Sequence, residues 1–170
     1  FALYTGFVHA LSGLGLGRFP AVKALKRRAV SLLKANTADV LGHRMMLDRA
    51  DFFQLSLKGV FEPFETELVR RELKRRSVVL DIGANIGYYT LLFARQVGET
   101  GRVYAFEPHP GNFALLGKNV ALNGYRNVVL VPKAVSSANG TAKLYLAPEN
   151  IGDHRIYDSR DDRPHVQIET

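Results

Sequence analysis

The sequence contains no cysteine, so disulfides, thiolate zinc sites and cysteine nucleophiles are excluded. No apolar run approaches the roughly 18 residues that a membrane-spanning helix needs. The five histidines are scattered, without the spacing typical of a metal site. We therefore expect no transmembrane segment and no metal, and the composition is compatible with a reducing, cytoplasmic compartment.

The 170 residues suffice for one domain, and a hydrophobic share of 46% argues against wholesale disorder. Residues 1–17 are apolar and glycine-rich, but they begin with Phe and lack a basic stretch. We interpret them as an internal or trimmed start and not as a secretion signal.

The formal charge of +7 lies entirely in the first part of the chain. Residues 1–76 hold 14 Lys and Arg against 7 Asp and Glu, whereas residues 77–170 hold 9 of each kind. Within the basic part, residues 20–34 predict a basic amphipathic helix. Such a helix can bind an anionic membrane or RNA, or it can pack through its apolar face. We favour packing, and the balanced second half gives no reason to expect a nucleic-acid partner.

An alternation of strands and helices begins at Val78. Three apolar runs have the length of buried strands: residues 78–82, 103–106 and 128–131. Two predicted helices separate them, at residues 88–96 and 110–122. Strands separated by helices indicate right-handed βαβ units and a parallel sheet, so we predict an α/β fold.

The flanking segments predict further elements. Before the sheet we predict strands within residues 39–47 and 52–58, the second from its period of two. A helix follows from Pro63, with acidic residues near its start and Lys74 to Arg76 near its end. After the sheet we predict strands at 142–146 and 165–169 around a polar loop. We divide the chain into an extension, residues 1–58, and a ligand-binding domain that starts at residue 59.

The loop after the first of the three strands reads DIGANIG, residues 81–87. Its pattern is G-x-N-x-G, which differs from the G-x-G-x-x-G fingerprint of dinucleotide sites. Asn85 can replace a glycine because Asn tolerates a left-handed backbone better than most residues. Asp81, two residues before the first glycine, would repel a pyrophosphate but suits a cationic ligand. An NAD or FAD site is therefore disfavoured.

Glu107 ends the second of these strands, 20 residues after Gly87. An acid at this place can accept hydrogen bonds from both ribose hydroxyls, and ligands of open α/β sheets bind at the carboxyl ends of the strands. Asp81 and Glu107 together indicate a nucleoside with a cationic tail, such as S-adenosylmethionine. The less favoured alternative is a structural turn with a surface Glu.

Four stretches carry a resemblance to a known family: GVFEPFETELV, VVLDIGANIGYYTLLFA, VYAFEPHPGNFALLGKNVALNG and NVVLVPKAVSSANGTAKLY. They span roughly residues 59–146 and resemble the FkbM-type methyltransferases. The resemblance implies a Rossmann-like class I fold, with S-adenosylmethionine as cofactor.

The resemblance also implies a role for each matching position. Asp81 should hold the methionine amino group, directly or through water, and Glu107 should bind the ribose hydroxyls. Glu62 should approach the cofactor or cap the helix that follows it. The remaining implied contacts are Gly83, Ala84, Asn85 and Gly87 around the methionine, Tyr88 closing over the ligand, Pro108 beside the adenine, and Ala134 and Val135 lining the adenine pocket.

The sequence departs from the family near its end, where no fourth strand with an acidic motif follows. We therefore expect a fragment of a longer enzyme, with an incomplete sheet. The family implies O-methylation of a hydroxyl on a sugar, glycolipid or secondary metabolite.

Within the polar loop, His154 is the candidate general base, with Asp153 to orient it and Arg155 to bind an acidic acceptor. A loop without chemistry is the alternative. Two other functions stay open: an RNA or protein methyltransferase that docks through residues 20–34, and a nucleoside-binding module without turnover. The acceptor and the oligomeric state are not predicted.

Overall fold

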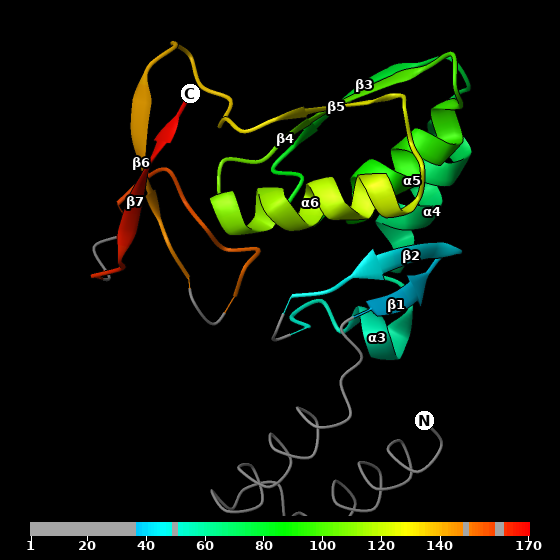
Figure 1. Cartoon of the computed structure of the whole chain (residues 1–170), viewed down its shortest axis with the longest axis horizontal. Helices are drawn as coiled ribbons and strands as arrows, with labels where there is room; N and C mark the ends of the chain where they lie inside the picture. Colours follow the sequence, from blue (N-terminus) through cyan, green and yellow to red (C-terminus); the bar gives the residue numbers. More distant parts are fainter. Residues whose placement is uncertain (1–36, 49–50, 148–149, 159–161) are drawn as a thin grey trace, which may run out of the picture. The chain divides into compact units, whose positions relative to one another are not determined.

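The computed structural model describes residues 37–48, 51–147, 150–158 and 162–170 (Figure 1). The chain divides into two compact units, Phe1–Ala35 and Asn36–Thr170, and all described residues belong to the second. The predicted basic helix at residues 20–34 lies outside them.

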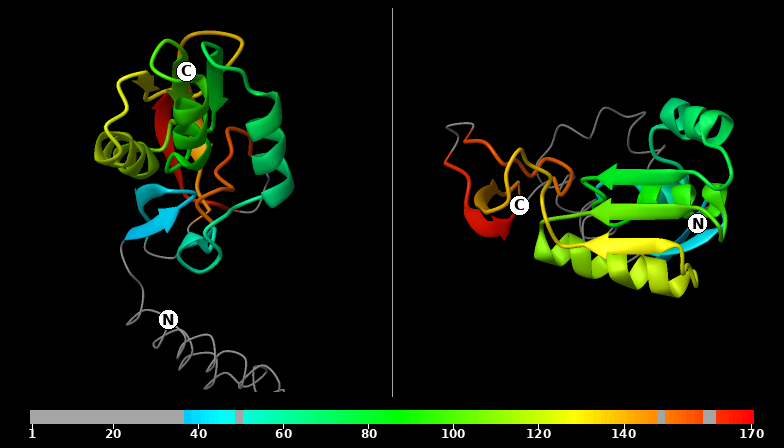
Figure 2. Two further views of the ribbon diagram at one scale, coloured as in Figure 1. Left: turned by 90° about the vertical axis from the view of Figure 1, so that its right-hand side faces the viewer. Right: turned by 90° about the horizontal axis from the view of Figure 1, so that it is seen from above.

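Three parallel strands form the central sheet, in the order β3-β4-β5. They are β3 (Val78–Ile82), β4 (Arg102–Phe106) and β5 (Val128–Val131). The crossovers are α5 (Tyr88–Val97) and α6 (Pro110–Leu122), which both cover the same face of the sheet (Figures 1 and 2). The predicted Rossmann-like α/β core is therefore confirmed.

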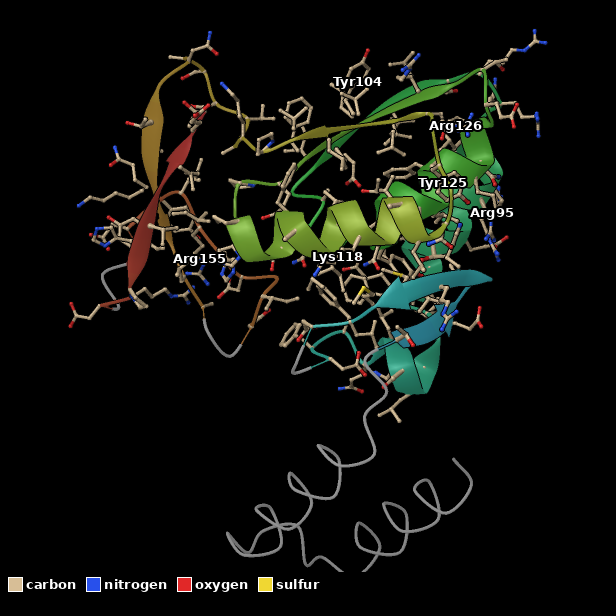
Figure 3. All side chains as sticks on the ribbon, viewed as in Figure 1. Arg95, Tyr104, Lys118, Tyr125, Arg126 and Arg155 are labelled. Carbon is tan, nitrogen blue, oxygen red and sulfur yellow. The ribbon has the colours of Figure 1, made fainter. Side chains whose placement is uncertain are left out.

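The core lies between this sheet and its two helices. Val103 and Ala105 on β4 are fully buried, as are Leu91 on α5 and Leu116 on α6. Burial of side chains such as valine and leucine contributes about 1.5–3 kcal/mol each. Tyr104, between the two buried β4 residues, points away from the helices (Figure 3).

A hairpin precedes the sheet and packs against α6. Its antiparallel strands are β1 (Thr37–Val40) and β2 (His43–Met46). The turn between them places Leu41 and Gly42 in the left-handed region. The extended conformation predicted for residues 39–47 is thus confirmed only in part, because a turn at Leu41 and Gly42 divides this stretch between two strands.

The strand predicted at residues 52–58 is wrong. The segment holds a short helix, α3 (Leu55–Lys58), of which only Leu55 is buried. The Asp51 carboxylate accepts hydrogen bonds from the backbone N–H groups of Leu55 and Ser56, and these bonds satisfy the start of a helix. The next helix, α4 (Pro63–Glu72), begins at the predicted proline and ends before the basic residues 74–76.

A second hairpin follows the sheet. Its antiparallel strands, β6 (Thr141–Tyr145) and β7 (His165–Glu169), match the predicted ones to within a residue. The backbone N–H of Ala134 donates to the carbonyl of Glu169, so the hairpin is joined to the segment that leaves β5. Between the two strands, residues 150–158 return across Tyr145, which forms a β-bridge with Arg155.

Candidate functional site

The motif loop, residues 83–87, connects β3 to α5 in a tight backbone turn. Gly83, Asn85 and Gly87 all have positive φ angles, of 79°, 51° and 97°. Asn85 therefore adopts the left-handed conformation predicted from its place in G-x-N-x-G. A Cβ atom on Gly87 would lie 2.8 Å from Cδ1 of Leu116, so a larger residue here would displace this buried side chain in addition to straining the backbone.

Glu107 joins the motif loop to the end of β4. Its side chain is buried, with Oε2 accepting from the Asn85 N–H at 2.8 Å and Oε1 from the His109 N–H at 2.8 Å. Burial raises the pKa of Glu107, while these two hydrogen bonds act in the opposite direction. Each carboxylate oxygen keeps a further lone pair, so Glu107 can still accept hydrogen bonds from a ligand.

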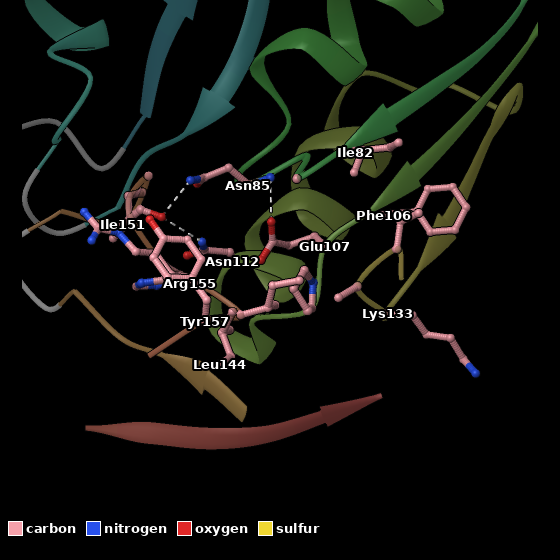
Figure 4. Close-up of a pocket in the computed structure, with 17 residues that line it drawn as sticks. Ile82, Asn85, Phe106, Glu107, Asn112, Lys133, Leu144, Ile151, Arg155 and Tyr157 are labelled. Carbon is pink, nitrogen blue, oxygen red and sulfur yellow. Dashed lines mark hydrogen bonds between the residues drawn. The ribbon is translucent and has the colours of Figure 1, made fainter. Parts of the chain in front are cut away.

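A cavity of about 320 Å³ opens at the carboxyl ends of β3 and β4 (Figure 4). Ligand sites of open α/β sheets occupy this position. Six of the residues predicted from the sequence as cofactor contacts line it: Gly83, Asn85, Glu107, Pro108, Ala134 and Val135. Apolar walls with a few polar groups are typical of small-molecule sites.

The other four named cofactor contacts do not line this cavity. Ala84 and Gly87 are buried within the turn itself. Asp81 is buried beneath it, where its Oδ2 accepts a hydrogen bond from the Thr90 hydroxyl and where burial raises the pKa of the carboxyl. The Tyr88 hydroxyl binds Thr66 instead, at 2.9 Å, so this ring packs toward α4.

Glu62 also has a different partner from the two expected. It occupies the position before α4 but makes no side-chain cap hydrogen bond. Its Oε2 accepts from the hydroxyl of Tyr89 at 2.8 Å. Glu62 thus connects the start of α4 to α5.

The segment of residues 150–157 forms one wall of the cavity. Two amides hold it there, because the Nδ2 groups of Asn85 and Asn112 both donate to the carbonyl of Ile151, at 2.8 and 3.3 Å (Figure 4). No pattern in the sequence indicated this contact, which joins the motif loop to a residue 66 positions away. The segment is therefore part of the site.

His154 does not have the geometry of a general base. Its Nδ1 accepts from the Ala147 N–H at 3.1 Å, so in the neutral ring the proton is on Nε2. Burial lowers the pKa of His154, with the neighbouring His109 as a second cause, which favours this neutral form. The predicted base therefore presents a donor, with no free lone pair.

Asp153 does not orient His154 as expected. Its two carboxylate oxygens pair with Arg155 at 2.9 Å and with Arg163 at 3.0 Å. The Arg155 guanidinium also lies 5.6 Å from the ring centre of Tyr157. Asp153 therefore stabilises the wall of the cavity through its ion pairs with two arginines.

The described part of the chain has neither a cluster of metal ligands nor a membrane-spanning helix. Within residues 37–48, 51–147, 150–158 and 162–170, no three His, Cys, Asp or Glu side chains come together as metal ligands. In the same ranges, no helix has the length and apolar character needed to cross a membrane.

Several known proteins are similar to parts of this chain. The curated Methyltransferase sdnD of Sordaria araneosa is 33% identical over 79 residues, which cover 46% of this chain and 30% of that protein. The structure of M. jannaschii TYW2 in complex with AdoMet is 26% identical with a TM-score of 0.45, over 56% of this chain and 41% of that chain. A SAM-dependent O-methyltransferase of Thermotoga maritima is 19% identical with a TM-score of 0.42, over 53% and 36%.

The family match covers the whole candidate site. Residues 81–170, more than half of the chain, match the Methyltransferase FkbM domain. The match starts at Asp81 and includes the motif loop, Glu107 and the segment 150–157. The chain therefore belongs to the FkbM methyltransferase family.

Proposed function

We propose that the chain binds S-adenosylmethionine in the cavity at the carboxyl ends of β3 and β4, and that the protein transfers its methyl group to a hydroxyl. S-adenosylmethionine is the methyl donor of FkbM methyltransferases. The observation that carries the proposal is that Glu107 and the motif loop, which were named from sequence alone, line one cavity.

The residues present fit this cofactor. Pro108, Ala134 and Val135 give the cavity apolar surface for a flat base, and Glu107 provides acceptors for ribose hydroxyls. Asn85 adds a buried Oδ1 atom without a hydrogen-bond partner, which can accept from the same ligand. These roles remain predictions.

Asp81 would act at the methionine end. The carboxylate of Asp81 lies beneath the motif loop and already binds Thr90. We therefore propose that it contacts the amino group through a water molecule and not directly. It would also favour the cation through its charge.

The acceptor is proposed to be an alcohol on a sugar, glycolipid or secondary metabolite. When bound, the cofactor supplies an electrophilic methyl group on a sulfonium. The chain's own residues hold the nucleoside and align the hydroxyl, which is the larger requirement for such a transfer. His154, with its proton on Nε2, is not proposed as the base.

Calorimetry with S-adenosylhomocysteine tests the binding part. Glu107→Ala removes two acceptors and a buried charge, so we predict a loss of affinity of about tenfold or more. Glu99→Ala is the matched control, because Glu99 is an exposed acid after α5. Equal affinity in the Glu107 variant and the wild type would contradict the assignment.

Methyl transfer needs a separate assay. Labelled S-adenosylmethionine would be offered with acceptors that carry both alcohol and carboxylate groups, such as a sugar acid, and the product treated with mild alkali. An alkali-stable label indicates an ether, as proposed, whereas an alkali-labile label indicates a carboxyl ester and would exclude O-methylation of alcohols.

A further inference from the structure

Two buried polar atoms in the cavity wall have no partner. Among the residues that the structure describes, only Asn85 Oδ1 and His154 Nε2 are buried side-chain atoms without a hydrogen bond. Both residues line the proposed cofactor cavity. Buried polar groups nearly always have a hydrogen-bond partner in folded proteins, so two such atoms without a partner at one cavity require an explanation.

The chemical character of the two atoms is fixed by their neighbours. The Asn85 amide donates through Nδ2 to the Ile151 carbonyl, which leaves its Oδ1 as an acceptor. The His154 ring accepts through Nδ1 from the Ala147 N–H, which leaves its Nε2 as a donor. The wall of the cavity thus contains one unused acceptor and one unused donor.

The donor lies at the end of the cavity where the adenine is expected. The ring of His154 packs against the ring of His109, with centroids 4.6 Å apart. His109 directly follows Pro108, the residue expected beside the adenine. Asn85, in contrast, belongs to the motif loop at the methionine end.

We propose that His154 recognises the adenine of the cofactor, with its Nε2–H donating a hydrogen bond to a ring nitrogen. This inference rests on the proposed function. Adenine ring nitrogens without hydrogen accept hydrogen bonds, and Pro108, Ala134 and Leu144 in the same lining have no side-chain donor that competes with His154. A donor buried in such a wall discriminates strongly against a ligand that lacks the matching acceptor.

Binding would require a small movement of the wall. The Nε2 atom is screened from solvent, so the adenine reaches it when the segment 150–157 shifts outward. The segment contains Gly152 and exposes Ile156 and Tyr157, and none of its side chains is fully buried, although Asp153 and Arg155 make polar contacts within it. Its hydrogen bonds to Asn85 and Asn112 keep it attached to the site.

Calorimetry on the full chain tests the inference with two variants. His154→Phe keeps a ring against His109 but removes the donor, so the affinity for S-adenosylhomocysteine should fall at least fivefold. His154→Gln restores an N–H donor and should recover part of that loss. Circular dichroism establishes that both variants are folded. An unchanged affinity in a folded His154→Phe variant would overturn the inference.

The wild-type chain gives a second test that needs no variant. The 1-deaza, 3-deaza and 7-deaza analogues of S-adenosylhomocysteine each replace one ring nitrogen by C–H. One of them should bind the wild type at least fivefold more weakly than the parent ligand and should bind His154→Phe no more weakly than the parent does. If all three bind the wild type as well as the parent, the inference fails.

The two proposals fail in different ways. If Glu107→Ala lowers affinity while His154→Phe and the three analogues have no effect, the cofactor site stands and only the role of His154 is wrong. If the wild-type chain does not bind S-adenosylhomocysteine, both are wrong.

Discussion

His43 on β2 is a buried histidine whose neutral form is favoured in the folded protein. Its Nε2 shares a hydrogen bond of 2.7 Å with the Tyr125 hydroxyl. Burial is the main cause that lowers the pKa of His43 from 6.5 to about 4, and the charge of Arg95 adds to it. Because the folded-state pKa lies below the unfolded value, the stability contributed by the neutral ring is complete above pH 6.5 and is lost as the pH falls toward 4.

We therefore predict that the stability depends on pH and that His43→Gln makes this dependence weaker. The urea midpoint of the wild type should fall more steeply between pH 6.5 and pH 4 than that of the variant, which has no titrating group at this position. Chemical denaturation at several pH values measures the difference. Parallel curves for the two proteins would show that His43 is not responsible.

The predictability of the site also differs from residue to residue. Glu107 was found from its spacing after Gly87, because strand ends in βαβ units meet at one edge. The contact of Asn112 with Ile151 was not predictable, since an amide bound to a distant carbonyl leaves no pattern in the sequence. His154 was chosen by residue type alone, whereas its tautomer depends on the Ala147 N–H, which only the fold brings near.

At the scale of elements, the parallel core was predictable and the segment before α4 was not. The strands and helices of the core followed from apolar runs of the right length, and their bounds agree to within one or two residues. At residues 52–58 the alternation of apolar residues suggested a strand, but the Asp51 side chain stabilises a helical turn. A local side-chain contact thus outweighed a weak periodicity.

Asn119 on α6 connects two elements that support the site. It is 0% exposed, its Nδ2 donates to the carbonyls of Ile86 at 2.7 Å and Met46 at 3.0 Å, and its Oδ1 accepts from the Met46 N–H at 2.7 Å. One turn later, Asn123 binds the N–H and carbonyl of Arg44 in the same manner, at 3.0 and 2.8 Å. Both residues pair with β2, but Asn119 also holds the motif loop.

This difference makes Asn123 a matched control for Asn119. Asn119→Leu leaves buried backbone groups unpaired, so we predict a loss of about 1–3 kcal/mol in unfolding free energy. It should also weaken S-adenosylhomocysteine binding severalfold, because the motif loop loses a support. Asn123→Leu should be less destabilising and should keep the affinity within about twofold. Urea unfolding and calorimetry measure both effects, and equal losses of affinity in the two variants would contradict the link to the loop.

At the scale of the whole molecule, one face of the sheet is apolar and uncovered in the described part of the chain. Val78, Leu80 and Ile82 on β3 are 68%, 61% and 61% exposed, which is unusual for apolar residues of a parallel sheet. Tyr104 lies on the same face (Figure 3). Among the described strands, β3 pairs only with β4, so it also presents an open edge.

Exposed apolar faces and open strand edges favour association between copies of a chain. We therefore predict that the 170-residue chain self-associates as its concentration rises, and that Leu80→Lys reduces this association because a charge on the face must be desolvated on contact. Leu122→Lys is the control, since Leu122 is 44% exposed at the end of α6, and α6 covers the opposite face. Sedimentation velocity over a range of concentrations measures the association. Similar behaviour of the two lysine variants would mean that the uncovered sheet face does not drive it.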